Sequence, residues 1–272
     1  MPQIPEDLIK ALMDMSGQSR QEVEQILSKS IHEMTSSIPV IHPTTAAATN
    51  KVLRDGKPLD FDEFNYPHYL PAEHVMKYTI RVSLRGISPA IWRKFECPSN
   101  ITLRHLTELI LDLMGWAGYH LNHIYYGKDA FYEPYYQRDA EMEMMSSWEH
   151  LNQEEATIAD ILSEKGKTLR FEYDFGDSWE HDIRLSSIDE YAPGEPHIIV
   201  FKGGKRACPP EDCGGIWNYA DLLDILAKKR ARKRLTQEEK EILEWADVDK
   251  DFDPEFLDLE ECEEVCEDFN EV

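Results

Sequence analysis

The chain has 272 residues, a formal net charge of -24 and a pI of about 4.7. This charge argues against general nucleic-acid binding, because affinity for phosphates comes from Lys and Arg. Hydrophobic residues make up 42% and charged residues 30%, so a core can form while some segments remain solvated. The length suits one large domain or two small ones.

The sequence predicts a cytoplasmic protein without a membrane segment. No apolar run approaches the roughly 18 residues that span a bilayer, and the first ten residues lack the apolar stretch of a signal peptide. The five cysteines are an odd number, which fits reduced thiols in a cytosol.

Residues 1–35 are predicted to form an N-terminal helical extension. Leu8, Leu12 and Met15 recur at helical spacing, and Ser19 with Glu22 has the spacing of a capping box. A pair of short helices over residues 5–33 is typical of an interaction element, so we expect any protein partner to bind there. The proline-rich residues 36–75 are interpreted as a linker or wrapping arm, and the aromatic residues of its second half indicate that this half packs against another surface.

The core domain is predicted to cover residues 76–260. A half-buried strand begins it, because apolar and polar residues alternate from Tyr78 to Leu84, and residues 91–95 are the expected return strand. Thr102 is predicted to cap a helix that ends near Gly115. A strand follows over residues 120–126, whereas residues 128–150 show no clear period and are predicted to be loop.

The second half of the core contains the clearest local signals. Residues 169–175 and 179–185 alternate on either side of a Gly-Asp-Ser turn and predict a β-hairpin. The spacing of Thr157 and Asp160 predicts a short capped helix, and residues 198–201 a short strand. Helices are expected over residues 219–233 and 236–245, and residues 261–272 are interpreted as an acidic tail. Together these elements predict an α+β fold.

The hairpin tip carries the first candidate site, formed by Asp174, Asp177 and His181. Two carboxylates and an imidazole within eight residues can bind a divalent metal such as zinc or share a proton. His181 falls on the apolar face of its strand with Trp179 and Ile183. The structural alternative is that Asp177 bonds local backbone N–H groups and His181 is a core residue.

The segment from Gly203 to Gly215 carries the second candidate site. Its four glycines and two prolines fix an irregular backbone path around Cys208, Asp212 and Cys213. Zinc sites usually need a second ligand pair. The two thiols could join Cys262 and Cys266, or His181 or His120, or could simply be buried.

The third candidate is the corner after the first core helix. If Leu121 points inward, His120 and Asn122 share the opposite face, which makes His120 a better ligand or base than His123. The alternative is that this aromatic turn only closes the corner. A calcium loop is not expected over residues 247–253, because Phe252 occupies the glycine position of an EF-hand.

Four strings resemble the plasmid pRiA4b ORF-3-like family: residues 173–181, residues 206–215, residues 88–93, and Asp253-Pro254-Glu255 with the following Phe256. The resemblance covers about residues 78–258. It implies an α+β fold with a curved, mostly antiparallel sheet and flanking helices. The family is largely uncharacterised, and some members are labelled transposon-resolvase-like. The family's typical His-Leu-His corner is His120-Leu121-Asn122 here.

Three functional hypotheses follow. The first is a binding or adaptor module whose pocket is organised by Asp177, His181, Cys208, Asp212 and Cys213. The second is a divalent-metal-dependent hydrolase in which an ion is held by Asp174, Asp177, His181 and His120, and Asp212 or Glu180 is the general base. The third is a mobile-element protein that binds nucleic acid through the basic residues 228–234.

Overall fold

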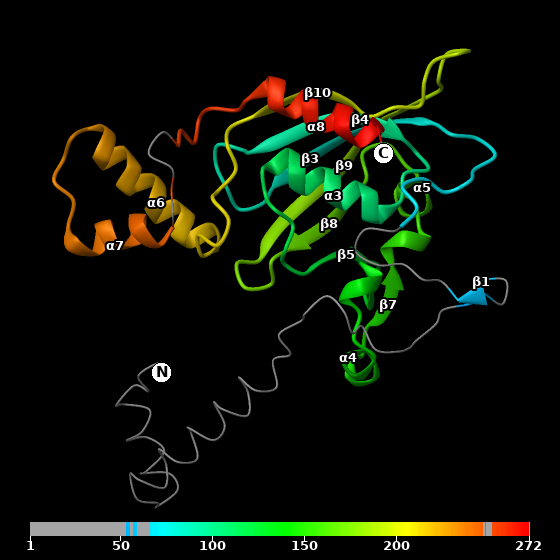
Figure 1. The fold of residues 1–272 in the computed structure, drawn as a ribbon, viewed down its shortest axis with the longest axis horizontal. Coiled ribbons are helices and arrows are strands. Elements are labelled where there is room, and N and C mark those ends of the chain that lie inside the picture. The colour runs from blue at the N-terminus through cyan, green and yellow to red at the C-terminus, as the bar shows by residue number, and fades with distance from the viewer. Residues whose placement is uncertain (1–52, 55–56, 59–65, 247, 249–251, 272) are drawn as a thin grey trace, which may run out of the picture. The chain divides into compact units, whose positions relative to one another are not determined.

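The computed structural model describes residues 53–54, 57–58, 66–246, 248 and 252–271. The predicted N-terminal helices, most of residues 36–75 and most of the acidic stretch 247–251 lie outside these residues. The remainder forms an α+β fold built on one large sheet (Figure 1).

The sheet has eight strands in the order β10-β4-β3-β9-β8-β5-β6-β7. All neighbouring strands are antiparallel except β6 and β7, which confirms the expected mostly antiparallel sheet. The strands are β3 (Lys77–Leu84), β4 (Trp92–Pro98), β5 (Asn122–Tyr126), β6 (Ala130–Glu133), β7 (Glu149–Asn152), β8 (Thr168–Tyr173), β9 (Trp179–Asp189) and β10 (Val200–Lys205). A separate two-stranded pair is formed by β1 (Leu53–Arg54) and β2 (Lys57–Pro58).

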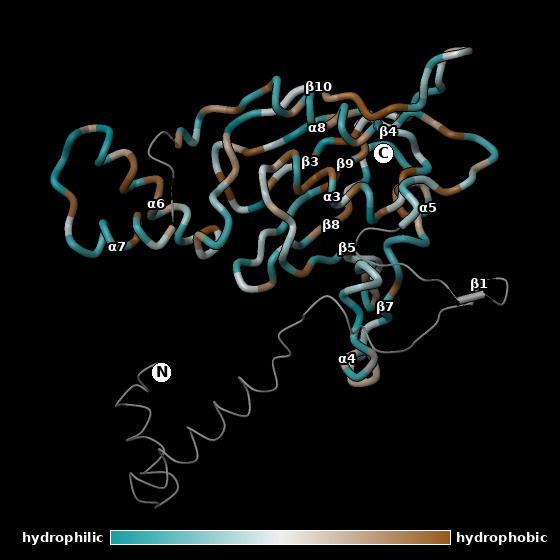
Figure 2. The backbone as a smooth tube through the Cα atoms, viewed as in Figure 1, coloured by the Kyte–Doolittle hydropathy of each residue, from teal (hydrophilic) through white to brown (hydrophobic). Residues whose placement is uncertain are grey.

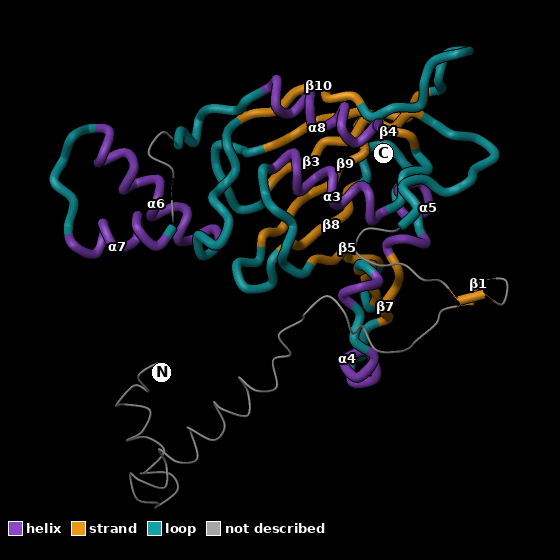
Figure 3. Tube along the Cα trace, in the orientation of Figure 1, coloured by secondary structure: helices purple, strands orange, loops and turns teal. Residues whose placement is uncertain are grey.

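Helices α3 and α8 cross the sheet on its near face in Figure 3. The helices are α3 (Leu103–Met114), α4 (Ala140–Met145), α5 (Ile158–Ile161), α6 (Gly215–Arg230), α7 (Gln237–Trp245) and α8 (Leu259–Glu271), with 3-10 turns at Tyr135–Gln137 and Gln153–Glu155. Within the described part of the chain, no helix has the length and apolar character needed to cross a membrane.

The core lies between the sheet and helix α3. The inward side chains of β3 and β9 are fully buried at Ile80, Val82, Trp179 and Ile183, as the alternation in their sequences predicts. Figure 2 shows the resulting mixture of hydrophobic and hydrophilic residues along these strands. Helix α3 is buried on nearly all sides, with ten of its twelve residues buried. It is capped by Gly115, which adopts the left-handed conformation at φ 83°.

Two segments differ from the sequence-based expectation. Residues 128–150 are not a loop: they contain β6, a 3-10 turn, α4 and the start of β7. Ala130 pairs with Glu149 in a parallel register, and this pairing leaves no local periodic signal. The expected acidic tail belongs to helix α8, which buries Cys262 and Cys266 one turn apart while its acidic residues remain on the other side.

Residues 66–70 pack against the core, as expected for the second half of the arm. Tyr69 forms an isolated β-bridge with Ile101, and the backbone N–H of Thr102 donates to the carbonyl of His68 at 2.9 Å. The Thr102 hydroxyl has two roles, since it accepts from the N–H of His105 at 3.2 Å and donates to the carbonyl of Pro67 at 2.8 Å. One side chain therefore caps α3 and anchors the arm.

Replacing Thr102 by valine is expected to lower the free energy of unfolding by about 2 kcal/mol, because a helix cap and a buried hydrogen bond are lost together. The matched control is Thr236→Val in the exposed cap of α7, where the hydroxyl only accepts from Glu239 at 3.1 Å, and about 1 kcal/mol is expected. Urea unfolding of both variants measures the difference. An equal loss at the two positions would contradict the second role of Thr102.

Candidate functional site

Three segments meet at the candidate site: the corner after α3, the tip of the β8–β9 hairpin, and the loop of residues 206–215. The Nε2 atom of His120 lies 2.9 Å from Asp212 Oδ1 and 3.7 Å from Asp174 Oδ2. One ligand atom from each residue lies within 4.8 Å of the other two. We call these three residues the His120 cluster.

The hairpin tip positions Asp174 through its backbone. The N–H of Asp174 donates to the carbonyl of Leu121 at 2.9 Å, and its carbonyl accepts from the N–H of Ser178 at 2.6 Å. One carboxylate oxygen, Oδ1, accepts from the N–H of Gly176 at 2.9 Å, which leaves Oδ2 toward His120. Asp174 has a φ of 55°, a left-handed conformation that Asp tolerates better than most residues.

Asp177 holds the 206–215 loop against the hairpin tip. Its Oδ2 accepts from the N–H of Gly214 at 2.8 Å. At Gly215 the chains approach so closely that a Cβ atom would lie 2.6 Å from the Asp177 carbonyl oxygen. Only glycine fits there, where φ is 76°. Asp177 thus bonds a backbone N–H, but that of a distant loop and not of its own turn, and its side chain positions the loop that carries Asp212.

A second set of contacts joins the loop to the corner. The Tyr119 hydroxyl donates to Asp212 Oδ2 at 2.6 Å, and the Tyr173 hydroxyl donates to Glu211. The other Glu211 oxygen accepts from the N–H of Ala117 at 2.9 Å. The hydrogen bond to Asp212 raises the pKa of Tyr119 to about 12, so this hydroxyl remains a donor at neutral pH. Sequence reasoning missed Tyr119, Tyr173 and Glu211, although each lies inside a string already singled out.

Exposure increases across the His120 cluster from Asp174 to Asp212. The side chains of Asp174, His120 and Asp212 are 10%, 26% and 58% exposed. A cation at the cluster would thus be bound by the protein on one side and face solvent on the other. Two carboxylates and one imidazole form a ligand set suited to divalent ions such as Zn²⁺ or Mn²⁺.

His181 does not join this cluster. It is fully buried, with Phe171 and Trp116 rings at centroid distances of 5.2 and 5.4 Å. Burial lowers the pKa of His181 to about 4, so the imidazole is neutral near pH 7. Among the described residues it belongs to no group of three or more close metal-ligand atoms. Its position fits the core-residue alternative.

The other predicted candidates are also dispersed. Cys208 and Cys213 are buried, and burial raises their pKa values to about 11 and about 12, so both are thiols near neutral pH. Neither contributes to the His120 cluster. Glu180 pairs with Arg85 and Arg170 at 3.3 Å each. The carboxylate that the hydrolase hypothesis offers as a general base is therefore held in two ion pairs.

The orientation expected at Leu121 and Asn122 is reversed. Leu121 is exposed, whereas Asn122 is buried. The burial of Asn122 is explained by its hydrogen bonds, since its Oδ1 accepts from Gln153 at 3.1 Å and its N–H donates to Gln137 at 3.0 Å. Gln137 lies in the segment predicted to be loop, and Gln153 lies just after it, where no element is predicted.

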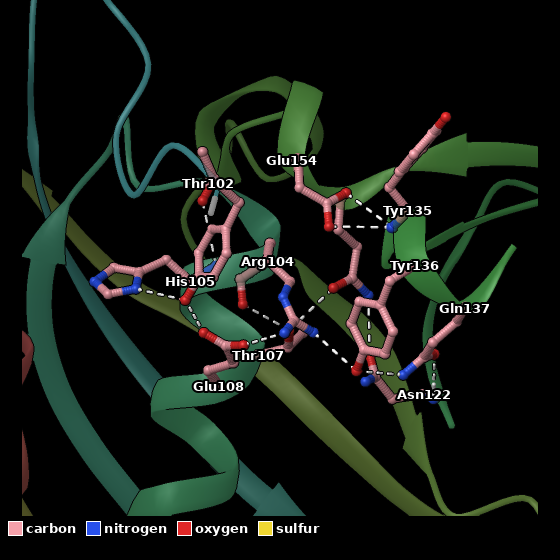
Figure 4. A network of polar contacts seen from close by, with 12 residues as sticks. Thr102, Arg104, His105, Thr107, Glu108, Asn122, Tyr135, Tyr136, Gln137 and Glu154 are labelled. Atoms are coloured by element: carbon pink, nitrogen blue, oxygen red, sulfur yellow. Dashed lines mark hydrogen bonds and ion pairs between the residues drawn. The ribbon is translucent and has the colours of Figure 1, made fainter. Parts of the chain in front are cut away.

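A hollow of about 300 Å³ lies beside the same corner. Figure 4 shows a network of polar contacts that includes four of its wall residues, Arg104, Glu108, Asn122 and Tyr136. Arg104 pairs with Glu108 and donates to the Tyr136 hydroxyl at 3.2 Å, and Thr107 donates to Gln153 at 3.0 Å. A second acidic group, formed by Glu133, Glu143 and His150, is already partly neutralised by Arg138, which lies 2.5 Å from Glu143.

The three segments that form the site all lie within one known protein family's pattern. The model of the plasmid pRiA4b ORF-3-like protein family matches residues 76–261. The chain belongs to this family. All three residues of the His120 cluster lie within the matched region.

Two similar proteins are themselves without an assigned function. The uncharacterized protein y4hQ of Sinorhizobium fredii (strain NBRC 101917 / NGR234) is 28% identical over 169 residues, which are 61% of this chain and 78% of that protein. The crystal structure of the protein of unknown function MM3350 from Methanosarcina mazei Go1 is 28% identical with a TM-score of 0.56, covering 69% of this chain and 97% of that one. These similar proteins leave the function to be argued from the site.

The buried His181 is expected to make folding stability depend on pH. An unfolded histidine binds a proton below about pH 6.5, whereas folded His181 resists protonation down to about pH 4. The unfolded state therefore binds more protons in this window, and stability falls as the pH is lowered from about 6.5 to about 4 by roughly 3 kcal/mol.

Denaturant unfolding at several pH values of wild type and His181→Leu measures this contribution. The variant is expected to have a shallower pH slope, although His105, whose pKa burial also lowers, leaves some slope. His197→Gln, at an exposed position, is the control and should retain the wild-type slope. An unchanged slope in His181→Leu would show that His181 titrates alike in both states.

Proposed function

We propose that this protein is a divalent-cation-binding module and that the His120 cluster is its binding site. The observation that carries the proposal is the convergence of three ligand atoms from three separate segments within 4.8 Å of one another. His120 comes from the corner after α3, Asp174 from the hairpin tip and Asp212 from the glycine-rich loop. Each is one of the ligand types that divalent transition ions accept.

The charges of the cluster support the same proposal. Two carboxylates converge on one imidazole, and no lysine or arginine among the described residues forms an ion pair with either of them. Two carboxylates this close to one imidazole concentrate negative charge at one point. A divalent ion would offset this charge and leave the cluster close to neutral.

The backbone supports it as well. Asp174 and Asp212 both have positive φ angles, of 55° and 57°. A non-glycine residue in this conformation has a conformational cost, and such costs are concentrated at functional sites. Glycine would relieve the strain at either position but would remove the carboxylate.

A divalent-metal-dependent hydrolase is the second candidate. The observation that favours it is the 58% exposure of Asp212, because catalytic metal sites combine three protein ligands with an open position. A free base is harder to assign. Glu180 is paired with two arginines, and both oxygens of Glu211 accept hydrogen bonds. Simple binding therefore has more support than hydrolysis.

The nucleic-acid hypothesis receives less support from the contacts. In the basic stretch of residues 228–234, Lys228 pairs with Glu239 at 2.5 Å, and Arg230 with Asp253 at 2.8 Å. These pairs reduce the charge available for phosphates.

The full chain is expected to bind one Mn²⁺ or Zn²⁺ ion at the His120 cluster. Asp174→Asn and Asp212→Asn should each weaken binding by roughly 10- to 100-fold or more, and Tyr119→Phe by about tenfold through loss of its hydrogen bond to Asp212. Calorimetry with Zn²⁺ and electron paramagnetic resonance of free Mn²⁺ measure these changes.

The control is His150→Gln in the second acidic group, which should bind as wild type does. Absence of binding, or wild-type affinity in both aspartate variants, would refute the proposal. Hydrolysis of activated phosphate and carboxylate esters by the loaded protein, lost in Asp212→Asn, would establish the second candidate in its place.

A further inference from the structure

A second cavity, of about 210 Å³, lies between the end of α3, the start of α8 and the first residues of the 206–215 loop. Each segment contributes a sulfur-containing residue to its wall, namely Met114, Cys262 and Cys208. This cavity shares no residue with the His120 cluster.

Two of these residues bring their sulfur atoms close together. Cys208 Sγ lies 3.0 Å from Met114 Sδ, and Arg93 Nη2 donates to Cys208 Sγ at 3.7 Å. Cys262 lines the same cavity, and the Arg93 guanidinium lies close enough to favour its thiolate electrostatically. One guanidinium therefore contacts the Cys208 thiol and lies in the same cavity wall as the Cys262 thiol, although the two cysteines are far apart in sequence.

Arg93 is buried without a carboxylate partner among the described residues. It is 2% exposed, and its other donors go to the carbonyls of Leu113, Trp92 and Arg206 at 2.7, 3.0 and 3.0 Å. Carbonyl groups bond the guanidinium but do not cancel its charge. Buried charges are normally balanced by an opposite charge. Among the groups that the guanidinium contacts, the one that can become anionic is the thiol of Cys208, and the Cys262 thiol lines the same cavity.

We propose that this cavity is a binding site for a soft monovalent metal ion of the Cu(I) class, held by the thiolates of Cys208 and Cys262 and the thioether of Met114. Sulfur ligands select such ions, whereas a structural zinc site needs four ligands, usually Cys or His. Asp112, Asp258 and Glu261 also line the cavity and would attract a cation.

Charge and protons balance in this binding step. Each thiol transfers its proton to solvent, the two thiolates and the ion together carry one negative charge, and Arg93 neutralises it. No electron is transferred. Two protons are therefore released for each ion bound, and the affinity should fall by about 100-fold for each unit by which the pH is lowered below the thiol pKa values.

Silver(I), a redox-inert probe of the same class, tests the proposal on the reduced full-length chain in chloride-free buffer. We expect one equivalent to be retained against excess glutathione. Calorimetry of the first equivalent in buffers of different ionisation enthalpy should count two released protons. Cys208→Ala and Cys262→Ala should each lose retention, and Met114→Leu should weaken it.

Cys266→Ala is the matched control, because Cys266 lies one turn along the same helix with similar burial, and it should retain the ion. Since buried substitutions can unfold a protein, crystals of the wild type with one equivalent of silver give an independent readout. Anomalous density between Cys208 and Cys262 supports the site. Density at other cysteines, loss of the ion to glutathione, or equal loss in Cys266→Ala and Cys262→Ala would overturn it.

Discussion

Both proposed sites depend on the hydrogen bonds made by the buried guanidinium of Arg93. It bonds the carbonyl of Leu113 at the end of α3 and the carbonyl of Arg206 at the start of the 206–215 loop. Removing such a donor would leave buried carbonyls unsatisfied at a cost of about 1–3 kcal/mol each. Arg93 thereby fixes the point at which the loop leaves the sheet and the point at which the corner leaves the helix.

Beyond Arg206 the loop is held at successive residues by groups from other segments. Trp116 donates to the Pro209 carbonyl at 2.9 Å, Glu211 accepts from Ala117, and Gly214 donates to Asp177. Asp212 lies between these anchored residues in the loop, so its position beside His120 is set by the protein chain. A site organised in this way loses little conformational entropy when it binds an ion, which favours affinity.

Most of the regular fold could be predicted, because its signals are local. The cap at Thr102, the capping boxes at Thr157 and Thr236, and the hairpin are each specified by neighbouring residues. The strands of residues 128–152 could not, since they pair in part with distant partners. At the site, His120, Asp174 and Asp212 were among the predicted candidates. The pattern placed His181 on the apolar face of its strand, but could not show that aromatic rings surround it.

The acidic composition attracts cations to both sites equally, whereas the ligand atoms of the two sites favour different ions. A net charge of -24 raises the local concentration of any cation near the surface, irrespective of its chemistry. Selectivity must then arise from the donors. Oxygen and imidazole nitrogen at His120, Asp174 and Asp212 suit harder divalent ions, whereas the sulfur atoms beside Arg93 suit soft monovalent ones. The positive charge of Arg93 increases this difference in selectivity, because it repels a divalent ion more strongly than a monovalent one. The two sites can thus share one loop without competing for one ion.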